Sequence, residues 1–222
     1  MTSNLRGDQK KIAQIKAVYE DYKAASLSYL EESGIYTPGF VWGCGDVSSE
    51  VVLIGEAPGK DEVETGIPFA GKAGSILNRF IELTSCKRED MFITNTIKYR
   101  LSRPRAGSLP TMIPVYENKS LSNRPASSKE IALASSYLRE ELFILSPRFI
   151  VTLGNTPLKA VFMSFFPDEK VKTVGDFHGN ISKLPGFNDT YLYPVFHPAS
   201  LIYNPAAEPL YTEDLIKLGS FL

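Results

Sequence analysis

A run of apolar residues that leads into a glycine-rich turn constrains this chain more than any other feature. Residues 51–54 are Val-Val-Leu-Ile, a pattern typical of a strand that is buried on both faces. The turn at residues 55–74 holds five glycines, which allow positive φ angles and a close approach of the backbone to a ligand. It also holds four carboxylates, Glu56, Asp61, Glu62 and Glu64. Ligands of open α/β sheets bind at such strand ends, although a solvated acidic loop would have the same composition.

Strand and helix patterns alternate along the rest of the chain. Strands are predicted at residues 51–54, 91–97, 149–153 and 191–196, and helices at residues 9–33, 75–84, 127–145 and 210–218, with a short helix after Gly154. The segment Ser127-Ser128-Lys129-Glu130 has the pattern of a capping box, which is typical of the first turn of a helix. This alternation favours a parallel sheet that is covered by helices on both faces.

The length and composition predict one globular domain at residues 1–222, with an N-terminal helix and loop at residues 1–40. The net charge of -1 and the pI near 6.2 exclude a global attraction to nucleic acid, so DNA binding would need a local basic patch. Cys44 and Cys86 lie far apart without a CxxC pattern, which indicates neither a disulfide framework nor a metal site. No stretch has the length of a membrane span and the N-terminus is polar, so we expect a cytoplasmic protein without membrane contact.

Residues 98–129 differ from the rest of the chain in charge. Their basic residues are Lys98, Arg100, Arg103, Arg105, Lys119, Arg124 and Lys129, against the single acid Glu117. Prolines interrupt any periodicity, which predicts a long basic loop inserted at residues 99–127. Clustered lysines and arginines release counterions from a nucleic-acid backbone, so this loop is a candidate phosphate-contacting arm; a surface insertion without a specific role is the alternative.

Polar residues gather at the predicted strand ends. They are Glu56 and Glu62 after the first strand, Asn95 near the end of the second and His197 after the fourth. Because the carboxyl ends of parallel strands share one edge of the sheet, these side chains can surround one pocket, with Phe69 as an aromatic wall. An asparagine amide offers the donor and acceptor that pair with an imide edge. Taken singly, Phe69 would be a core residue, Asn95 and His197 turn residues, and the carboxylates caps of backbone amides.

Four motifs together resemble the uracil-DNA glycosylase superfamily, and its family 4 in particular. They are Gly55-Glu56-Ala57-Pro58-Gly59, Gly66-Ile67-Pro68-Phe69-Ala70-Gly71-Lys72-Ala73-Gly74, Ile93-Thr94-Asn95 and His197-Pro198-Ala199-Ser200-Leu201. The resemblance covers roughly residues 41–218 and implies a three-layer α/β/α sandwich around a four-stranded parallel sheet. It further implies a monofunctional glycosylase that flips uracil out of DNA and hydrolyses its N-glycosidic bond, in base excision repair.

The resemblance also implies a role for individual residues. Phe69 would stack on the base, Asn95 would read its Watson–Crick edge, and His197 would stabilise the departing uracil anion. Glu56 and Glu62 would position water or support the cationic sugar, and the backbone of Ala57, Pro58 and Gly59 would line the pocket. DNA contacts are expected from Lys72, Arg103, Arg105, Pro198, Ala199, Ser200 and Leu201, the last four pressing into the duplex. Deaminated DNA is the expected partner, and a monomer the expected state.

The chain departs from family 4 at the positions of a four-iron, four-sulfur cluster. Tyr99 and Tyr137 stand where family members have cysteines, and an N-terminal CxxC is missing. We therefore expect no cluster, no other metal and no other cofactor, with both tyrosines packed against the N-terminal helix. Tyr203 replaces an arginine that is common after the His-Pro motif.

Three interpretations follow from these residues. The first is a glycosylase specific for uracil, and the second is a glycosylase of shifted range that acts on hypoxanthine or xanthine. The third is a catalytically impaired module of the same fold that binds DNA or a nucleotide. A phosphate-binding P-loop enzyme is disfavoured because the glycine turn lacks the Gly-Lys-Ser/Thr ending.

Overall fold

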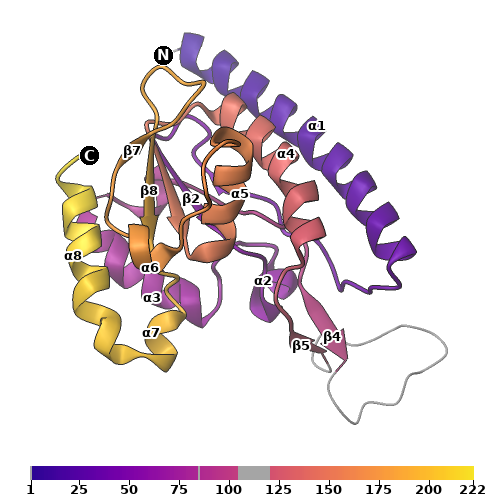
Figure 1. Ribbon diagram of the computed structural model, residues 1–222. Helices are drawn as coiled ribbons and strands as arrows, with labels where there is room; N and C mark the ends of the chain where they lie inside the picture. The colour runs from indigo at the N-terminus through magenta and orange to yellow at the C-terminus, as the bar shows by residue number, and fades with distance from the viewer. Residues whose placement is uncertain (1, 85, 105–120) are drawn as a thin grey trace.

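The computed structural model describes residues 2–84, 86–104 and 121–222 and has three layers, helices on either side of a central sheet (Figure 1). The strand order of this sheet is β1-β3-β2-β6-β8-β7. Its strands are β1 (Cys44–Gly45), β2 (Val51–Gly55), β3 (Phe92–Asn95), β6 (Phe149–Leu153), β7 (Ser182–Lys183) and β8 (Tyr191–Val195). The four strands β3, β2, β6 and β8 are mutually parallel, which confirms the expected architecture.

The two edge strands β1 and β7 run antiparallel to their neighbours, so the sheet is wider than the predicted four strands. Each edge strand has two residues, too few to show an alternating pattern in the sequence. The predicted strand at residues 91–97 is shorter in the structure and ends at Asn95. Beyond it, the backbone N–H groups of Thr96 and Ile97 donate to the carbonyls of Gly55 and Glu56, which carries the chain across the end of β2.

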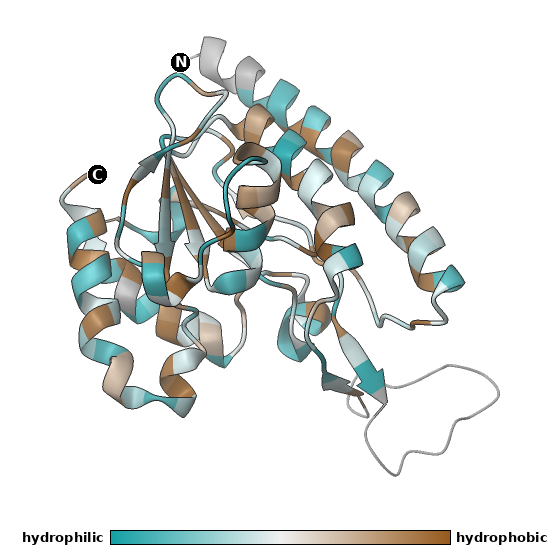
Figure 2. Cartoon of the chain, viewed as in Figure 1, coloured by the Kyte–Doolittle hydropathy of each residue, from teal (hydrophilic) through white to brown (hydrophobic). Residues whose placement is uncertain are grey.

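The helices divide between the two faces of the sheet. Helices α1 (Thr2–Glu32), α4 (Ser128–Leu145) and α5 (Asn155–Phe165) cover one face, and α3 (Lys72–Ile81) and α8 (Glu208–Gly219) cover the other. Residues of β2 alternate between the two cores: Val52 and Ile54 pack with α1, α4 and α5, while Val51 and Leu53 pack with α3 and α8. Burial on both faces explains the unbroken apolar run that leads into the turn. In Figure 2, hydrophilic and hydrophobic residues alternate along α1.

Short helices complete the fold. They are α2 (Lys60–Thr65), α6 (Val174–Phe177), α7 (Ser200–Tyr203) and the 3-10 helices Glu82–Thr84, Arg88–Asp90 and Pro205–Ala207. The capping box of α4 is confirmed, because the Ser127 hydroxyl accepts from the Glu130 N–H and the Glu130 carboxylate accepts from the Ser127 N–H. None of the described helices combines the length and apolarity that a bilayer crossing requires.

The prediction of a structureless loop at residues 99–127 is wrong at both of its ends. Strands β4 (Ser102–Pro104) and β5 (Leu121–Asn123) pair as an antiparallel hairpin that projects from the body of the molecule (Figure 1). Basic residues of this segment are also inside the protein: Lys98 and Arg100 are buried, and Arg124 is paired with Glu130. These three side chains therefore do not form the expected phosphate-contacting arm. Arg103 is exposed, and Arg105 lies outside the described residues.

Candidate functional site at the carboxyl edge of the sheet

Asn95 and Phe69 meet over the end of β2. Asn95 is the register partner of Gly55 in the neighbouring parallel strand. A Cβ on Gly55 would lie 2.3 Å from Asn95 Oδ1 and 2.6 Å from Phe69 Cζ, so both side chains occupy the space that only a glycine leaves. Phe69 itself has a φ of 55°, an uncommon value for an aromatic residue, and strained backbone of this kind gathers at binding sites.

The glycines of the turn serve close packing more than unusual backbone angles. Of the five, only Gly66 has a positive φ, which corrects the expectation that positive φ explains the group. A Cβ on Gly74 would lie 1.7 Å from the Phe69 carbonyl oxygen. The absence of a side chain at Gly74 therefore lets helix α3 pack directly against the backbone of Phe69. The turn also contains helix α2, which the sequence patterns did not predict.

His197 follows β8 and faces the Phe69 ring, with 6.0 Å between the ring centroids. Its Nδ1 accepts a hydrogen bond of 3.1 Å from the Ala199 N–H, which assigns the proton of the neutral ring to Nε2. Burial lowers the pKa of His197 to about 4, so the imidazole is neutral near pH 7. Nε2 makes no hydrogen bond within the described part of the chain and is available as a donor.

Phe69, Asn95 and His197 line one cavity of about 420 Å³. The other lining residues are Ala57, Gly59, Lys60, Asp61, Glu62, Gly71, Lys72, Ala73, Asn123 and Ala199. Asn95 is 3% exposed as a whole residue, and its side-chain amide makes no hydrogen bond with any described residue. Because this amide lines the cavity, its donor and acceptor are available to a ligand that enters.

The two predicted catalytic carboxylates lie differently. Glu62 lines the cavity, its Oε1 accepts from the Gly71 N–H at 3.4 Å, and a Cβ on Gly59 would lie 2.5 Å from its Oε2. Glu56 is absent from the lining of the cavity in the described structure, although its carbonyl binds the Ile97 N–H. Pro58 is buried and also lies outside the lining. Glu62 is thus the better placed of the two carboxylates.

The loop after His197 presents a different residue from the one expected. Ala199 lines the cavity, whereas Leu201 is 6% exposed and packs into the core beneath α8. The exposed side chains of α7 are Ile202 at 46% and Tyr203 at 87%. Pro198 is buried and Ser200 donates through its hydroxyl to the His197 carbonyl, which fixes the turn.

Comparison with known proteins agrees with this geometry. The family model of the uracil DNA glycosylase superfamily matches residues 42–217. The chain belongs to the uracil DNA glycosylase superfamily. It is 31% identical to the type-4 uracil-DNA glycosylase of Saccharolobus solfataricus, over 81% of this chain and 74% of that protein. It is 30% identical to the type-4 uracil-DNA glycosylase of Thermotoga maritima, over 82% of each chain.

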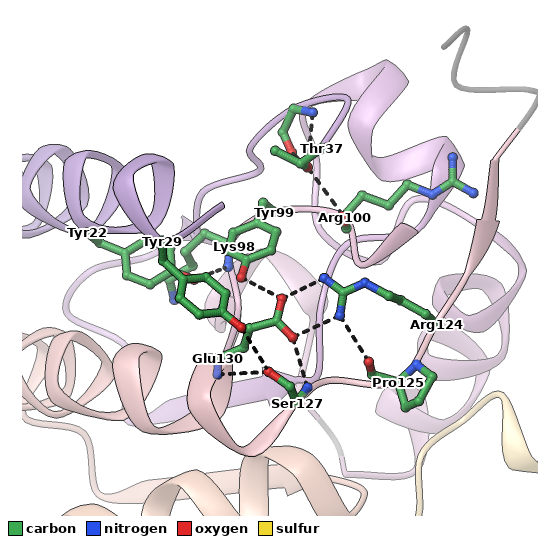
Figure 3. A network of polar contacts seen from close by, with 11 residues as sticks. Tyr22, Tyr29, Thr37, Lys98, Tyr99, Arg100, Arg124, Pro125, Ser127 and Glu130 are labelled. Atoms are coloured by element: carbon green, nitrogen blue, oxygen red, sulfur yellow. Dashed lines mark hydrogen bonds and ion pairs between the residues drawn. The ribbon is translucent and has the colours of Figure 1, made fainter. Parts of the chain in front are cut away.

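The iron–sulfur cluster of family 4 does not fit the residues at the corresponding positions of this superfamily member. Tyr99 is 1% exposed and donates from its hydroxyl to Glu130 Oε1 at 2.8 Å. Figure 3 shows Arg124 and Ser127 pointing at the same carboxylate. Tyr137 packs edge-on against Tyr22 of α1, which confirms the expected packing on the N-terminal helix. Phenol hydroxyls that are bonded or packed in this way offer no thiolate to iron.

Asn123 is a cavity residue that sequence reasoning missed. It ends β5, and its Oδ1 accepts from the Arg100 guanidinium at 3.1 and 3.0 Å. Arg100, which the charge pattern indicated as a phosphate contact, instead holds Asn123 in place. Three-residue strands carry no periodic pattern, so only the pairing of β4 with β5 reveals this position.

Proposed function

We propose that this protein is a monofunctional DNA glycosylase that removes a deaminated base, in the first place uracil, from DNA. The observation that carries the proposal is the convergence of Phe69, Asn95 and His197 on one cavity from three separate motifs. The type-4 uracil-DNA glycosylases to which the chain is similar support uracil as the substrate. A base cannot enter this cavity from within a duplex, so catalysis requires that the nucleotide is flipped out.

Recognition would rest on stacking and on the free amide. The Phe69 ring forms one wall of the cavity and offers a face to a planar base. Asn95 would pair its amide with the imide edge of uracil, donating to O4 and accepting from N3–H. An analogue without this donor and acceptor pattern would leave the buried amide unpaired, which is the origin of strong discrimination.

The reaction breaks the bond between C1′ of the deoxyribose and N1 of the base. Its electron pair leaves with the base, and the negative charge spreads to O2, where His197 Nε2–H would donate a hydrogen bond. Water adds to the cationic C1′, and its proton passes to a carboxylate. Glu62, which lines the cavity, is our choice for that carboxylate, with Glu56 as the alternative from the first motif. The products are free base and an abasic site.

DNA would lie across the mouth of this cavity. Lys72 is exposed on the cavity rim, and Arg103 is exposed on the hairpin. Arg105 belongs to the same proposed contact but lies outside the described residues. The buried Leu201 stabilises the loop from below, so we assign contact with the duplex to Tyr203 and Ile202 beside it.

We also propose that the enzyme works without an iron–sulfur cluster. The support is the full sequence, which has two cysteines where a cluster of this type takes four, and the bonded state of Tyr99. Iron analysis of protein purified without oxygen tests this. Bound iron near four atoms per chain would overturn it.

The deciding experiment is excision on four matched oligonucleotides that carry uracil, hypoxanthine, xanthine or thymine, followed by alkali cleavage and gel analysis. We expect uracil to be released fastest and thymine not at all, with His197→Ala as the inactive control. Fastest release of hypoxanthine or xanthine would instead support the shifted range, because the free Asn95 amide can pair with more than one edge. Release of none of the four would leave a binding module and overturn the proposal.

A further inference from the structure

A buried cation lies directly beneath Asn95. Lys98 is 2% exposed, and its ammonium donates three hydrogen bonds, each of 2.6 Å. The acceptors are Thr94 Oγ1, the Asn95 carbonyl and Glu141 Oε2. Three acceptors satisfy all three N–H groups of the ammonium, which is the condition for a charge to remain in a protein interior.

The carboxylate of Glu141, which pairs with Lys98, also has a hydrogen-bond partner at its second oxygen. Glu141 of α4 has a fully buried side chain, and its Oε1 accepts from the hydroxyl of Tyr19 on α1. That hydroxyl in turn accepts from the Gly43 N–H at 3.1 Å. Lys98, Glu141 and Tyr19 thus form one hydrogen-bonded set, the Lys98 cluster, that joins the end of β3 to helices α1 and α4. The bonds from Lys98 to Thr94 and Asn95 are local, whereas those of Glu141 with Lys98 and Tyr19, and of Tyr19 with Gly43, join distant parts of the chain.

The backbone carbonyl of Asn95 accepts a hydrogen bond, whereas its side-chain amide makes none with a described residue. Its carbonyl is held by Lys98, and the next two residues donate from their N–H groups to Gly55 and Glu56. Its amide group meets the cavity without a hydrogen bond to any residue of the described ranges. The direction in which this amide points is therefore set by its backbone and by packing beside Phe69 over Gly55, without a hydrogen bond to the amide itself.

We propose that Lys98 is a positioning residue for base recognition, because its ammonium fixes the Asn95 carbonyl and so aims the free amide at the base. This inference rests on the proposed function of Asn95. Lys98 lies under the strand end and is absent from the cavity lining, so it acts through Asn95 and not on the substrate. A displacement of reacting groups by about 1 Å can cost on the order of 10²-fold in rate, which is the scale at which such a support matters.

A purely structural role is the competing explanation, since the Lys98 cluster also ties α1 and α4 to the sheet. The two explanations differ in what they predict for a variant that is stable but lacks the bond to Asn95. Lys98→Met alone would strand the Glu141 carboxylate in the core and could unfold the protein. The double variant Lys98→Met/Glu141→Gln removes both charges, and the glutamine oxygen still accepts from Tyr19.

The experiment compares this double variant with wild type and with Glu130→Gln, a matched control that loses a different buried ion pair of α4. The measurements are kcat and KM for uracil excision at a temperature at which all three proteins are folded, and NMR relaxation of the Asn95 side-chain amide. We expect excision efficiency of the double variant to fall about 10- to 100-fold, with a more mobile Asn95 amide. Glu130→Gln should keep wild-type values in both.

Wild-type kinetics and an equally rigid amide in the folded double variant would overturn the inference. The same loss of rate in Glu130→Gln would overturn it too, because weakened attachment of α4 would then suffice. If wild type itself releases no uracil, the proposed function fails, and the Asn95 amide relaxation still decides whether Lys98 positions that side chain.

Discussion

The cavity and the Glu130 network differ in how far their polar side chains are hydrogen-bonded. In the Glu130 network (Tyr99, Arg124, Ser127 and Glu130), the carboxylate accepts four hydrogen bonds of 2.6 to 2.9 Å. In the cavity, the Asn95 amide and His197 Nε2 have no partner among the described residues. The hydroxyls of Ser26, Ser102 and Thr152 are also buried without a hydrogen bond in the described structure. What marks the Asn95 amide and His197 Nε2 as binding groups is that they lack a partner and also line the cavity.

The causes of the pKa shifts also differ between the Glu130 network and the cavity. Burial on its own would raise the pKa of Glu130, but bonds from Arg124, Ser127 and Tyr99 outweigh it and lower the pKa to about 2. At His197 burial acts unopposed and lowers the pKa to about 4. Glu130 is held charged by its hydrogen-bond partners, and His197 is held neutral by its burial. The following experiments test whether changes at the cavity lower the rate of excision and changes in the Glu130 network lower stability.

The largest effect is expected for Asn95→Ala. Excision of uracil should fall on the order of 10²–10³-fold, because the amide that pairs with the base is lost. The melting temperature should stay the same or rise, because the amide has no partner in the described structure and its removal breaks no bond. Single-turnover excision and thermal unfolding of the same preparations measure both quantities. A variant that loses stability but keeps its rate would place Asn95 in the structural class.

Gly55→Ala should come next, with a loss of excision of about 10²-fold. The new Cβ would meet Asn95 Oδ1 at 2.3 Å and Phe69 Cζ at 2.6 Å, so both must move away from their positions around the cavity. Gly66→Ala in the same turn is the matched control. A Cβ on Gly66 meets nothing within 4 Å, so its strained φ should cost stability but not rate. Equal rates in the two variants would contradict the close packing that we describe.

Glu130→Gln should act on stability alone. It removes the charged acceptor of Arg124 and Tyr99 at a cost of about 2–3 kcal/mol, which is a drop of roughly 5–10 °C in melting temperature. The effect depends on pH. The pKa of Glu130 is about 2 in the folded state and about 4.3 in the unfolded state. The stabilisation that the charged carboxylate provides is therefore complete above about pH 4.3 and fades as the pH falls towards 2. The difference in stability between wild type and variant should therefore shrink steadily in unfolding curves measured from about pH 5 to pH 3 and vanish only near pH 2.

The sequence predicted the parts of the molecule that rest on periodic patterns or on dense local motifs. The buried strand before Gly55 is apolar at each position because both of its faces pack against helices. The capping box at Ser127 could be read directly, since its two hydrogen bonds join residues three apart. Phe69, Asn95 and His197 were predicted to converge because parallel strands end at one edge, and the cavity contains all three.

The features that were missed depend on pairing between distant residues. Charge alone could not tell Arg103, which is exposed, from Lys98 and Arg100, which are buried against acceptors more than twenty residues away. The leucine of the His-Pro motif was expected on the surface because the motif matched, yet Leu201 points inward and joins the hydrophobic core on the side of the sheet that α3 and α8 cover. The composition of a segment gives the number of its charges, but which of those charges are exposed to solvent depends on the fold.

The smallest effect is expected for Arg103→Ser, which tests where the functional region ends. Arg103 lies on the hairpin between the two compared regions, opposite Ser122, whose neighbour Asn123 lines the cavity. If its exposed guanidinium contacts a phosphate, the slope of log affinity against log salt should become less steep by about 1, with little change in the rate for bound substrate. Lys10→Ser removes an equal charge from an exposed position of α1 and should leave the slope unchanged. The N-terminal end of α1, to which Lys10 belongs, lies at the other end of the molecule from the β4–β5 hairpin (Figure 1). Equal slopes in wild type and both variants would assign the hairpin to the structural region, with Asn123 as its only contribution to the cavity among the described residues.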